Sequence, residues 1–98
     1  MNSKNTTWIV CQNSSQKGII NFYMLRGECS YYLFSQKYRH SIWDFFRNGV
    51  RFEKALDYGK AKHDVAIINV MQRIRRHISY MLRTENVEIP EIRNQFVA

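Results

Sequence analysis

The first third of the chain carries short runs of β-branched and aromatic residues separated by short polar stretches. These runs predict three strands, over about residues 6–11, 19–25 and 29–34. Gly18 and Gly27 lie in the intervening stretches, where glycine favours tight turns. Strands joined so closely usually pair in chain order, so the pattern predicts an antiparallel meander.

The third of these strands has four consecutive apolar residues. Strict alternation would direct Tyr31 and Leu33 to one face of the sheet, and Tyr32 and Phe34 to the other. We expect Tyr31 to pack in the core, whereas both packing and base stacking stay open for Tyr32.

Helical spacing replaces the alternation after residue 34. Ser35 is suited to cap a helix over about residues 36–48, with Gly49 at its C-terminal end. A short second helix is expected over about residues 51–58, and Gly59 is expected to weaken or end it.

The last third of the chain has the clearest period. Apolar residues recur at the i, i+3, i+4, i+7 spacing of one helix face over residues 64–83, which predicts a helix about 30 Å long. This helix could begin as early as Lys60. Asp64 is expected to cap it and to offset its dipole. The residues of the apolar face are Ile67, Val70, Met71, Ile74, Ile78, Met81 and Leu82.

The order of these elements indicates the fold class. Strands followed by helices predict an α+β fold, with a small three-stranded antiparallel sheet packed on two or three helices, the long one C-terminal. A chain of 98 residues is enough for one core. A single domain is therefore expected over residues 1–98, with residues 1–6 and about 86–98 as flexible ends.

Cysteine use and hydropathy indicate the compartment. Cys11 and Cys29 are too few for a disulfide framework, and the first residues lack the apolar core of a signal peptide. No apolar run approaches the roughly 20 residues that a membrane span needs. A cytoplasmic protein with free thiols and no membrane association is expected.

No arrangement of residues typical of catalysis is visible. The chain has no Gly-rich phosphate loop and no Cys-x-x-Cys, and His40, His63 and His77 lie far apart. His63 followed by Asp64 could be a general base with its carboxylate, but adjacent side chains seldom point at each other, so the capping role is favoured. We expect a binding protein that is not an enzyme and has no metal and no cofactor.

The net charge of +7 is concentrated in the middle of the chain. Residues 37–83 hold 11 of the 15 Lys and Arg residues against four Asp and Glu. A localised positive field attracts nucleic acid or an acidic protein surface.

The basic residues recur along faces of the predicted helices. Arg73, Arg76 and Tyr80 lie opposite the apolar face of the long helix, and Arg39 and Arg47 are spaced i, i+8 on the first. In that first helix a Trp stands between the two Arg, where it could stack on guanidinium groups or on a base. The candidate binding residues are Lys37, Arg39, Trp43, Arg47, Lys62, Arg73, Arg76, Tyr80 and Arg83.

Part of the chain resembles a known group of proteins. Residues 31–39 read Tyr-Tyr-Leu-Phe-Ser-Gln-Lys-Tyr-Arg, followed by Phe-Phe-x-x-Gly-Val at 45–50, Ala-Leu at 55–56 and Lys-Ala-Lys-His-Asp-x-Ala-Ile at 60–67. Over roughly residues 23–83 this pattern resembles short accessory proteins carried by phages and conjugative elements of Firmicutes-type bacteria. The resemblance implies a mobile-element protein that regulates DNA or inhibits a host defence system such as CRISPR.

Three hypotheses follow for function. The first is a small basic protein that contacts DNA or RNA through its basic helix faces. The second is an anti-CRISPR-like inhibitor that binds an effector protein complex, where Trp and Arg are common hot spots. A small nuclease is the third and least favoured. A solvated basic face without a ligand is the structural alternative to all three.

Overall fold

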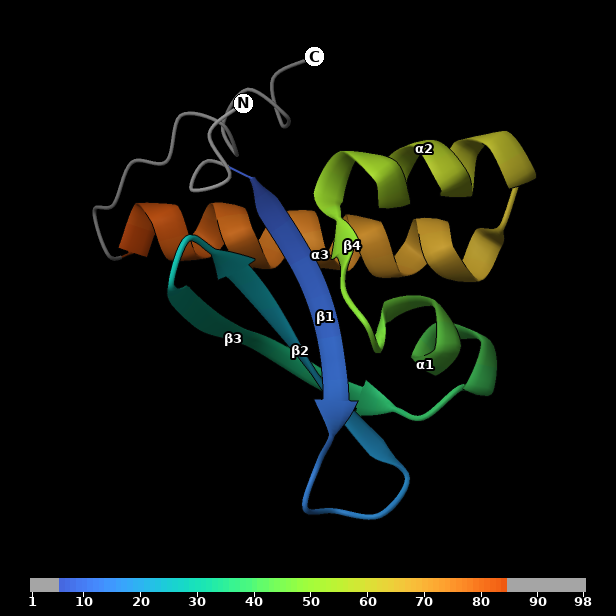
Figure 1. Ribbon diagram of the computed structural model, residues 1–98, viewed down its shortest axis with the longest axis horizontal. Coiled ribbons are helices and arrows are strands. Elements are labelled where there is room, and N and C mark those ends of the chain that lie inside the picture. Colours follow the sequence, from blue (N-terminus) through green and yellow to red (C-terminus); the bar gives the residue numbers. More distant parts are fainter. Residues whose placement is uncertain (1–5, 85–98) are drawn as a thin grey trace.

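The computed structural model describes residues 6–84 of the chain, with the side chains of residues 6–80. It is an α+β fold in which one antiparallel sheet packs against helices (Figure 1). The elements in chain order are β1 (Thr7–Asn13), β2 (Ile19–Arg26), β3 (Cys29–Lys37), α1 (His40–Phe46), β4 (Val50–Arg51), α2 (Phe52–Lys62) and α3 (Val65–Thr84). The flexible ends predicted from the sequence lie outside the described residues, apart from Thr6.

The sheet has four strands in the order β3-β2-β1-β4, rather than the three predicted. The meander of β1, β2 and β3 is confirmed, and β4 adds two residues to the far edge of β1. In this short strand Val50 pairs with Ile9 and Arg51 with Trp8. A two-residue strand directly before a helix has no periodic signal, so the sequence pattern could not reveal it.

A register shift in β3 changes which side chains share a face. Phe22 pairs with Phe34 and Tyr23 with Tyr32, so one extra residue, Leu33, lies between the two pairs. A β-bulge of this kind breaks the alternation of the strand. The prediction that Tyr32 and Phe34 face the same way is therefore wrong: Phe34 is buried in the core, whereas Tyr32 is exposed.

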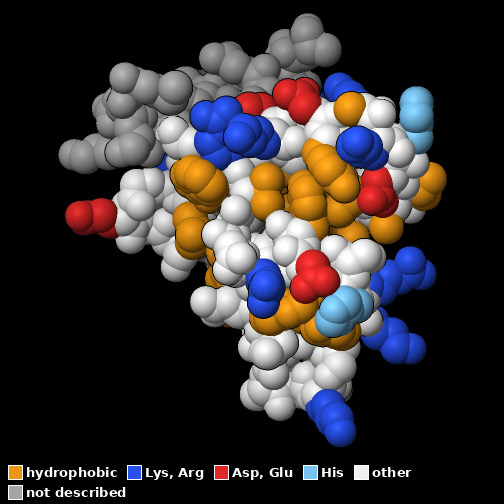
Figure 2. Space-filling view, turned by 45° about the vertical axis from the view of Figure 1, so that its right-hand side comes forward, with side chains coloured by type: hydrophobic (Ala, Val, Ile, Leu, Met, Phe, Trp, Pro, Cys, Tyr) orange, Lys and Arg blue, Asp and Glu red, His pale blue; other side chains and the backbone are white. Residues whose placement is uncertain are grey.

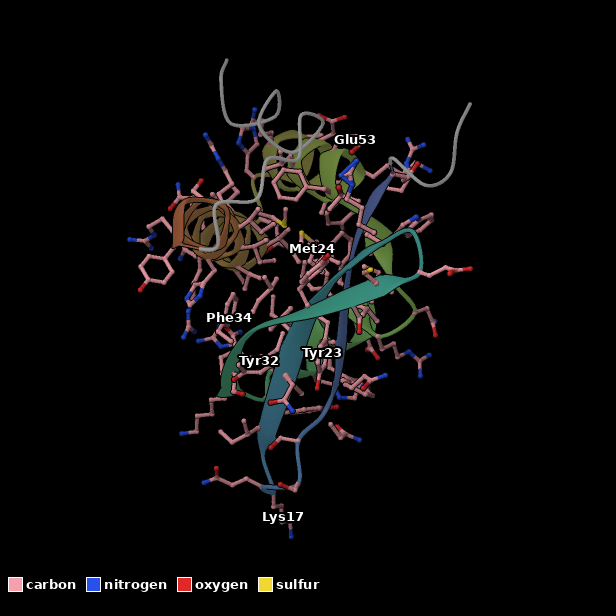
Figure 3. The ribbon with its side chains drawn as sticks, turned by 90° about the vertical axis from the view of Figure 1, so that its left-hand side faces the viewer. Lys17, Tyr23, Met24, Tyr32, Phe34 and Glu53 are labelled. Carbon is pink, nitrogen blue, oxygen red and sulfur yellow. The ribbon has the colours of Figure 1, made fainter. Side chains whose placement is uncertain are left out.

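All the described helices contribute to one core on one side of the sheet. In Figures 1 and 3, α3 crosses one face of the sheet with α2 packed along it, and none of the helices of residues 6–84 lies over the opposite face. Phe22 is central, with its ring centroid 5.1 Å from Phe34 and 5.3 Å from Phe46 of α1. Met24 points into the space between sheet and helices (Figure 3) and is fully buried. Within residues 6–84, no helix is both long and apolar enough to cross a membrane.

The first helix begins later than the sequence predicted. Strand β3 continues to Lys37, which pairs with Ile19, and α1 begins only at His40. The Ser35 hydroxyl does not cap a helix; it donates a hydrogen bond to Asn21 Oδ1 across the strands, at 2.5 Å. Pairing with β2 satisfies backbone groups that a helix would otherwise satisfy, and this tertiary contact outweighs the local capping signal.

The third helix follows the second through a two-residue turn. Asp64 Oδ1 accepts a hydrogen bond from the Ile67 N–H at 3.1 Å, which confirms the predicted cap. The helix starts at Val65 and not near Lys60, because α2 continues to Lys62 and ends at His63 in the left-handed conformation, with φ of 51°.

Gly59 lies inside α2 and neither ends nor interrupts it. A Cβ atom at this position would lie 3.2 Å from Ile68 Cγ1 and 3.3 Å from Ile67 Cγ2 of α3. These distances are shorter than ordinary carbon contacts, so the missing side chain allows α2 and α3 to approach closely. The prediction that Gly59 ends the helix is wrong because the close packing offsets its low helix propensity.

A larger side chain at this contact should separate the two helices. We expect Gly59→Leu to lower the free energy of unfolding by about 1–3 kcal/mol or more, since overpacking forces neighbours out of their rotamers. Urea denaturation measures the change. Ala61→Leu is the matched control, because Ala61 is exposed on the same helix. Equal stability of the two variants would contradict the close contact.

Candidate nucleic-acid interface

Arg73 of α3 is attached to the edge strand of the sheet. Its guanidinium carbon lies 4.1 Å from the Phe34 ring centroid. Nη1 donates to Gln36 Oε1 at 3.3 Å, and Nη2 donates to the Ser35 carbonyl at 3.5 Å. The cation–π contact and the two hydrogen bonds hold α3 against the end of β3. This predicted binding residue therefore has a structural role that the sequence did not indicate.

The same contact brings two separate basic segments together. Lys37 follows the Gln36 that accepts from Arg73, and it is exposed at the end of β3. Arg76 and Tyr80 follow Arg73 at i+3 and i+7, and both are exposed, Tyr80 by 60%. We call Lys37, Arg73, Arg76 and Tyr80 the β3–α3 surface.

The β3–α3 surface has charge of one sign. The sequences of β3 and α3 contain no Asp or Glu. A shallow surface hollow is lined by Arg73, Arg76, His77 and Tyr80 among its described residues. Cationic and aromatic side chains such as these are suited to contact phosphate oxygens and bases.

The face formed by α1 and α2 has mixed charge. Figure 2 shows hydrophobic side chains gathered where the two helices meet, with both Lys/Arg and Asp/Glu side chains around them. The rings of Phe45 and Tyr58 lie 4.8 Å apart and join the two helices. His40 Nε2 lies 3.3 Å from Asp44 Oδ2 on the exposed side of α1. Nearby acidic groups reduce the attraction of this face for an anionic ligand.

The predicted stacking residue of α1 packs inward. The Trp43 ring is partly buried against the core, 5.8 Å from the Tyr38 ring, and its backbone carbonyl accepts a weak hydrogen bond from Cys11 Sγ at 3.8 Å. Arg39 and Arg47 are exposed at the two ends of α1, as its N-cap and C-cap residues. Helix α1 has only seven residues, so the row expected at i, i+4 and i+8 includes both residues that flank the helix.

Two further candidates are not placed on the β3–α3 surface. Lys62 would belong to the long helix if that helix began as early as Lys60. It is instead the last residue of α2, because the turn at His63 separates the two helices. Arg83 lies in the last turn of α3, and its side chain is outside the described part of the chain.

His77 follows Arg76 on α3 and is half-buried. Its ring centroid is 4.9 Å from the Phe34 ring, beside the contact that Arg73 makes. Burial lowers the pKa of His77, and the positive charges of Arg73 and Arg76 lower it further. The imidazole is therefore neutral at pH 7, and the charge of this surface comes from its Lys and Arg.

The cysteines have contrasting surroundings. Both thiols are free; Cys11 is buried under α1, and Cys29 is exposed. Burial raises the pKa of Cys11 to about 11, so the thiol stays protonated and is a poor nucleophile. Within the described residues, no three His, Cys, Asp or Glu side chains come together in a way that could hold a metal ion.

On the outward-facing side of the sheet, sequence reasoning left a stacking role open for Tyr32 and did not select Trp8. Trp8 is 40% exposed and Tyr32 is 55% exposed there, and Tyr23 lies between them. The period of two along β1 already placed Trp8 opposite the core residue Ile9. The bulge at Leu33 separates Tyr32 from Phe34, which strict alternation had placed on the same face.

Comparisons with protein-family models, with curated proteins and with solved structures find no match to this chain.

The role of Arg73 can be separated from that of its exposed neighbour. We expect Arg73→Ala to lower the free energy of unfolding by about 1–3 kcal/mol, because it removes the cation–π contact and two charged hydrogen bonds. Arg76→Ala, which removes the same side chain from an exposed position of α3, should change it by less than about 0.5 kcal/mol. Chemical denaturation of both variants provides the comparison, and equal losses would rule out the anchoring role.

The lowered pKa of His77 predicts a pH-dependent stability. The unfolded chain, with His near its ordinary pKa of 6.5, takes up a proton more readily than the folded protein. Stability should therefore fall as pH decreases through 6.5, and the loss should level off below the folded-state pKa. His77→Phe keeps a ring against Phe34 and should remove this component. The free energy of unfolding is measured between about pH 7.5 and 5 for the unaltered protein and for His77→Phe. Equal changes with pH in the two proteins would contradict the prediction.

Proposed function

We propose that this protein is a non-enzymatic nucleic-acid-binding protein whose phosphate contacts come from the β3–α3 surface. The proposal rests on one observation above all: Arg73 joins the basic end of β3 to the exposed basic row of α3. This contact brings Lys37 and Arg73, which lie 36 residues apart in the sequence, to the same edge strand of the sheet.

Charge distribution supports this surface over the others. On α2, Lys54 and Lys60 share the helix with Glu53 and Asp57, whereas β3 and α3 have no acidic residue. Phosphate binding depends on the local potential and not on net charge alone. The one-signed surface is therefore the stronger attractor for a polyanion.

Each residue of the surface has a distinct expected role. Arg76 and Lys37 are exposed and can move toward phosphate oxygens. Arg73 has its guanidinium committed to β3, so it contributes positive field and positions the other two. Tyr80, with most of its side chain in solvent, can stack on a base or pack against a ribose.

The proposal predicts salt-dependent binding that depends on two exposed cations. We expect Lys37→Ala/Arg76→Ala to weaken binding to a labelled oligonucleotide and to reduce the slope of log K against log salt by about 1.5–2, which corresponds to two lost phosphate contacts. Fluorescence anisotropy at several salt concentrations measures both quantities, with single-stranded and duplex DNA and RNA as probes.

The control removes the same charge from another face. Lys54→Ala/Lys60→Ala also deletes two positive charges, but from the mixed-charge helix α2. It should leave the slope within error of the unaltered protein. Equal effects of the two double variants would show non-specific attraction by net charge. Binding that ignores salt, or no binding at low salt, would reject the proposal.

The protein-binding hypothesis gives a different result in a related experiment. An anti-CRISPR-like inhibitor would retain a defined effector complex from host lysate after nuclease treatment, and would lose it in the Lys37→Ala/Arg76→Ala variant. A nucleic-acid-binding protein would lose its co-purifying material when the lysate is treated with nuclease.

A further inference from the structure

The face of the sheet that points away from the described helices carries an unusual set of side chains for an outward-facing surface. The pairing register places Trp8 beside Leu25 and Arg51 in one cross-strand row, and Val10, Tyr23 and Tyr32 in the next. Trp8 and Tyr32 are among the most exposed large hydrophobic residues of the described chain. Single apolar residues on a surface need no explanation, but two adjacent rows centred on aromatic rings indicate a binding site.

Tyr32 is held in a fixed orientation. The Ser35 hydroxyl donates to Asn21 Oδ1, so the Tyr32 hydroxyl donates to Ser35 Oγ, at 2.6 Å. The Tyr32 and Tyr23 rings meet edge-to-face with centroids 5.9 Å apart. The phenol is thus fixed at its hydroxyl and along one side, while more than half of the side chain faces solvent. A ring held this way loses little conformational freedom when a ligand stacks on it.

Trp8 lies against the turn that leads into β4. A Cβ atom on Gly49 would lie 3.7 Å from Trp8 Cε3, so the indole lies against this glycine, whose φ is 88°. From strand spacings of about 4.8 Å and a rise of about 3.4 Å per residue, Trp8 and Tyr32 are roughly 12 Å apart on the sheet. They can therefore contact different parts of one extended ligand.

The charge around these rings fits an anionic ligand. None of the four strands contains an Asp or Glu. Lys37 extends the outward face of β3, because Gln36 points to the helix side, where it bonds Arg73. At the other end Arg51 lies beside Trp8, with Glu53 3.9 Å from its Nε. Aromatic faces next to cations, without carboxylates among the strands, match nucleic-acid bases on a phosphate backbone.

Single strands fit this face better than a duplex does. The bases of a duplex are stacked on one another, and their faces are not available to a flat sheet. The bases of a single strand can turn outward and stack on exposed rings, as bases do on other open sheets and OB-folds. Lys37 belongs both to this face and to the β3–α3 surface, so it joins the two across the edge strand.

We propose that the outward face of the sheet is a stacking platform for the bases of single-stranded nucleic acid, with Trp8 and Tyr32 as its two rings. This inference rests on the proposed function, since the β3–α3 surface provides the phosphate contacts. It adds the ligand class, a single strand, and a second surface for the bases.

The test compares variants that keep bulk but remove aromatic character. Trp8→Leu/Tyr32→Leu should weaken binding to a labelled oligothymidylate of about 12 nucleotides by roughly 5- to 150-fold for each stacked base lost. Trp8→Phe/Tyr32→Phe, the matched control, retains both rings and should stay within a few-fold of the unaltered protein. The salt slope should be unchanged in both, because no charge is altered.

A second measurement does not depend on a loss of binding. Trp8 and Trp43 are the two tryptophans of the chain. In a Trp43→Phe background, Trp8 is therefore the sole indole, and its emission should be quenched when oligothymidylate is added and should stay unquenched with the matching duplex. Thermal unfolding of each variant verifies that the fold is retained.

The outcomes distinguish the two proposals. If the leucine variant binds the single strand with unaltered affinity while Lys37→Ala/Arg76→Ala weakens it, the platform is rejected and the nucleic-acid function stands. If the unaltered protein binds neither single strand nor duplex, both proposals are rejected. Equal affinity for single strand and duplex, or unquenched Trp8 emission in the complex, also rejects the platform.

Discussion

The inner face of the sheet is buried against the three described helices, and this burial determines which side chains of the strands point outward. Phe22 contacts Phe34 within the sheet and Phe46 of α1, while Ile74 and Ile78 of α3 are fully buried in the same cluster. A sheet with one covered face must place every second side chain in solvent or against a partner. The outward-facing rows of β1, β2 and β3 are the direct consequence of that one-sided core.

Arg73 connects this core to the charged surface. Its guanidinium lies on Phe34, a core ring, and bonds to the polar end of β3 at the same time. A Lys could supply the charge but not the planar fork that stacks and donates in two directions. The position of the exposed cations of α3 relative to β3 therefore depends on Arg73, whose guanidinium is already engaged in these contacts. Arg73, which was selected from the sequence for its charge, thus acts first by holding α3 against β3 through the planar shape of its guanidinium.

The predictions made from the sequence agree best with the structure where a single local pattern determines the element. The long helix was predicted to within a residue or two because its apolar face repeats over five turns and Asp64 caps it. The start of α1 was wrong because Ser35 carried a local capping signal that competed with strand pairing. Tyr32 and Phe34 were wrongly predicted to share a face, because a single extra residue, Leu33, reverses the alternation beyond it. Local rules fail where a distant strand supplies the deciding contact.

The sequence by itself determined the α+β class, the one-core size, the long amphipathic helix and the concentration of positive charge in residues 37–83. These features depend on composition and on periods of two or 3.6 residues, which are properties of the chain alone. Only the tertiary structure decided that Arg73 contacts the residue next to Lys37, that Trp43 packs inward, and that Trp8 and Tyr32 are exposed on the side of the sheet away from the described helices. Each of these depends on which segments distant in the sequence come into contact, and that is determined by the packing of the core.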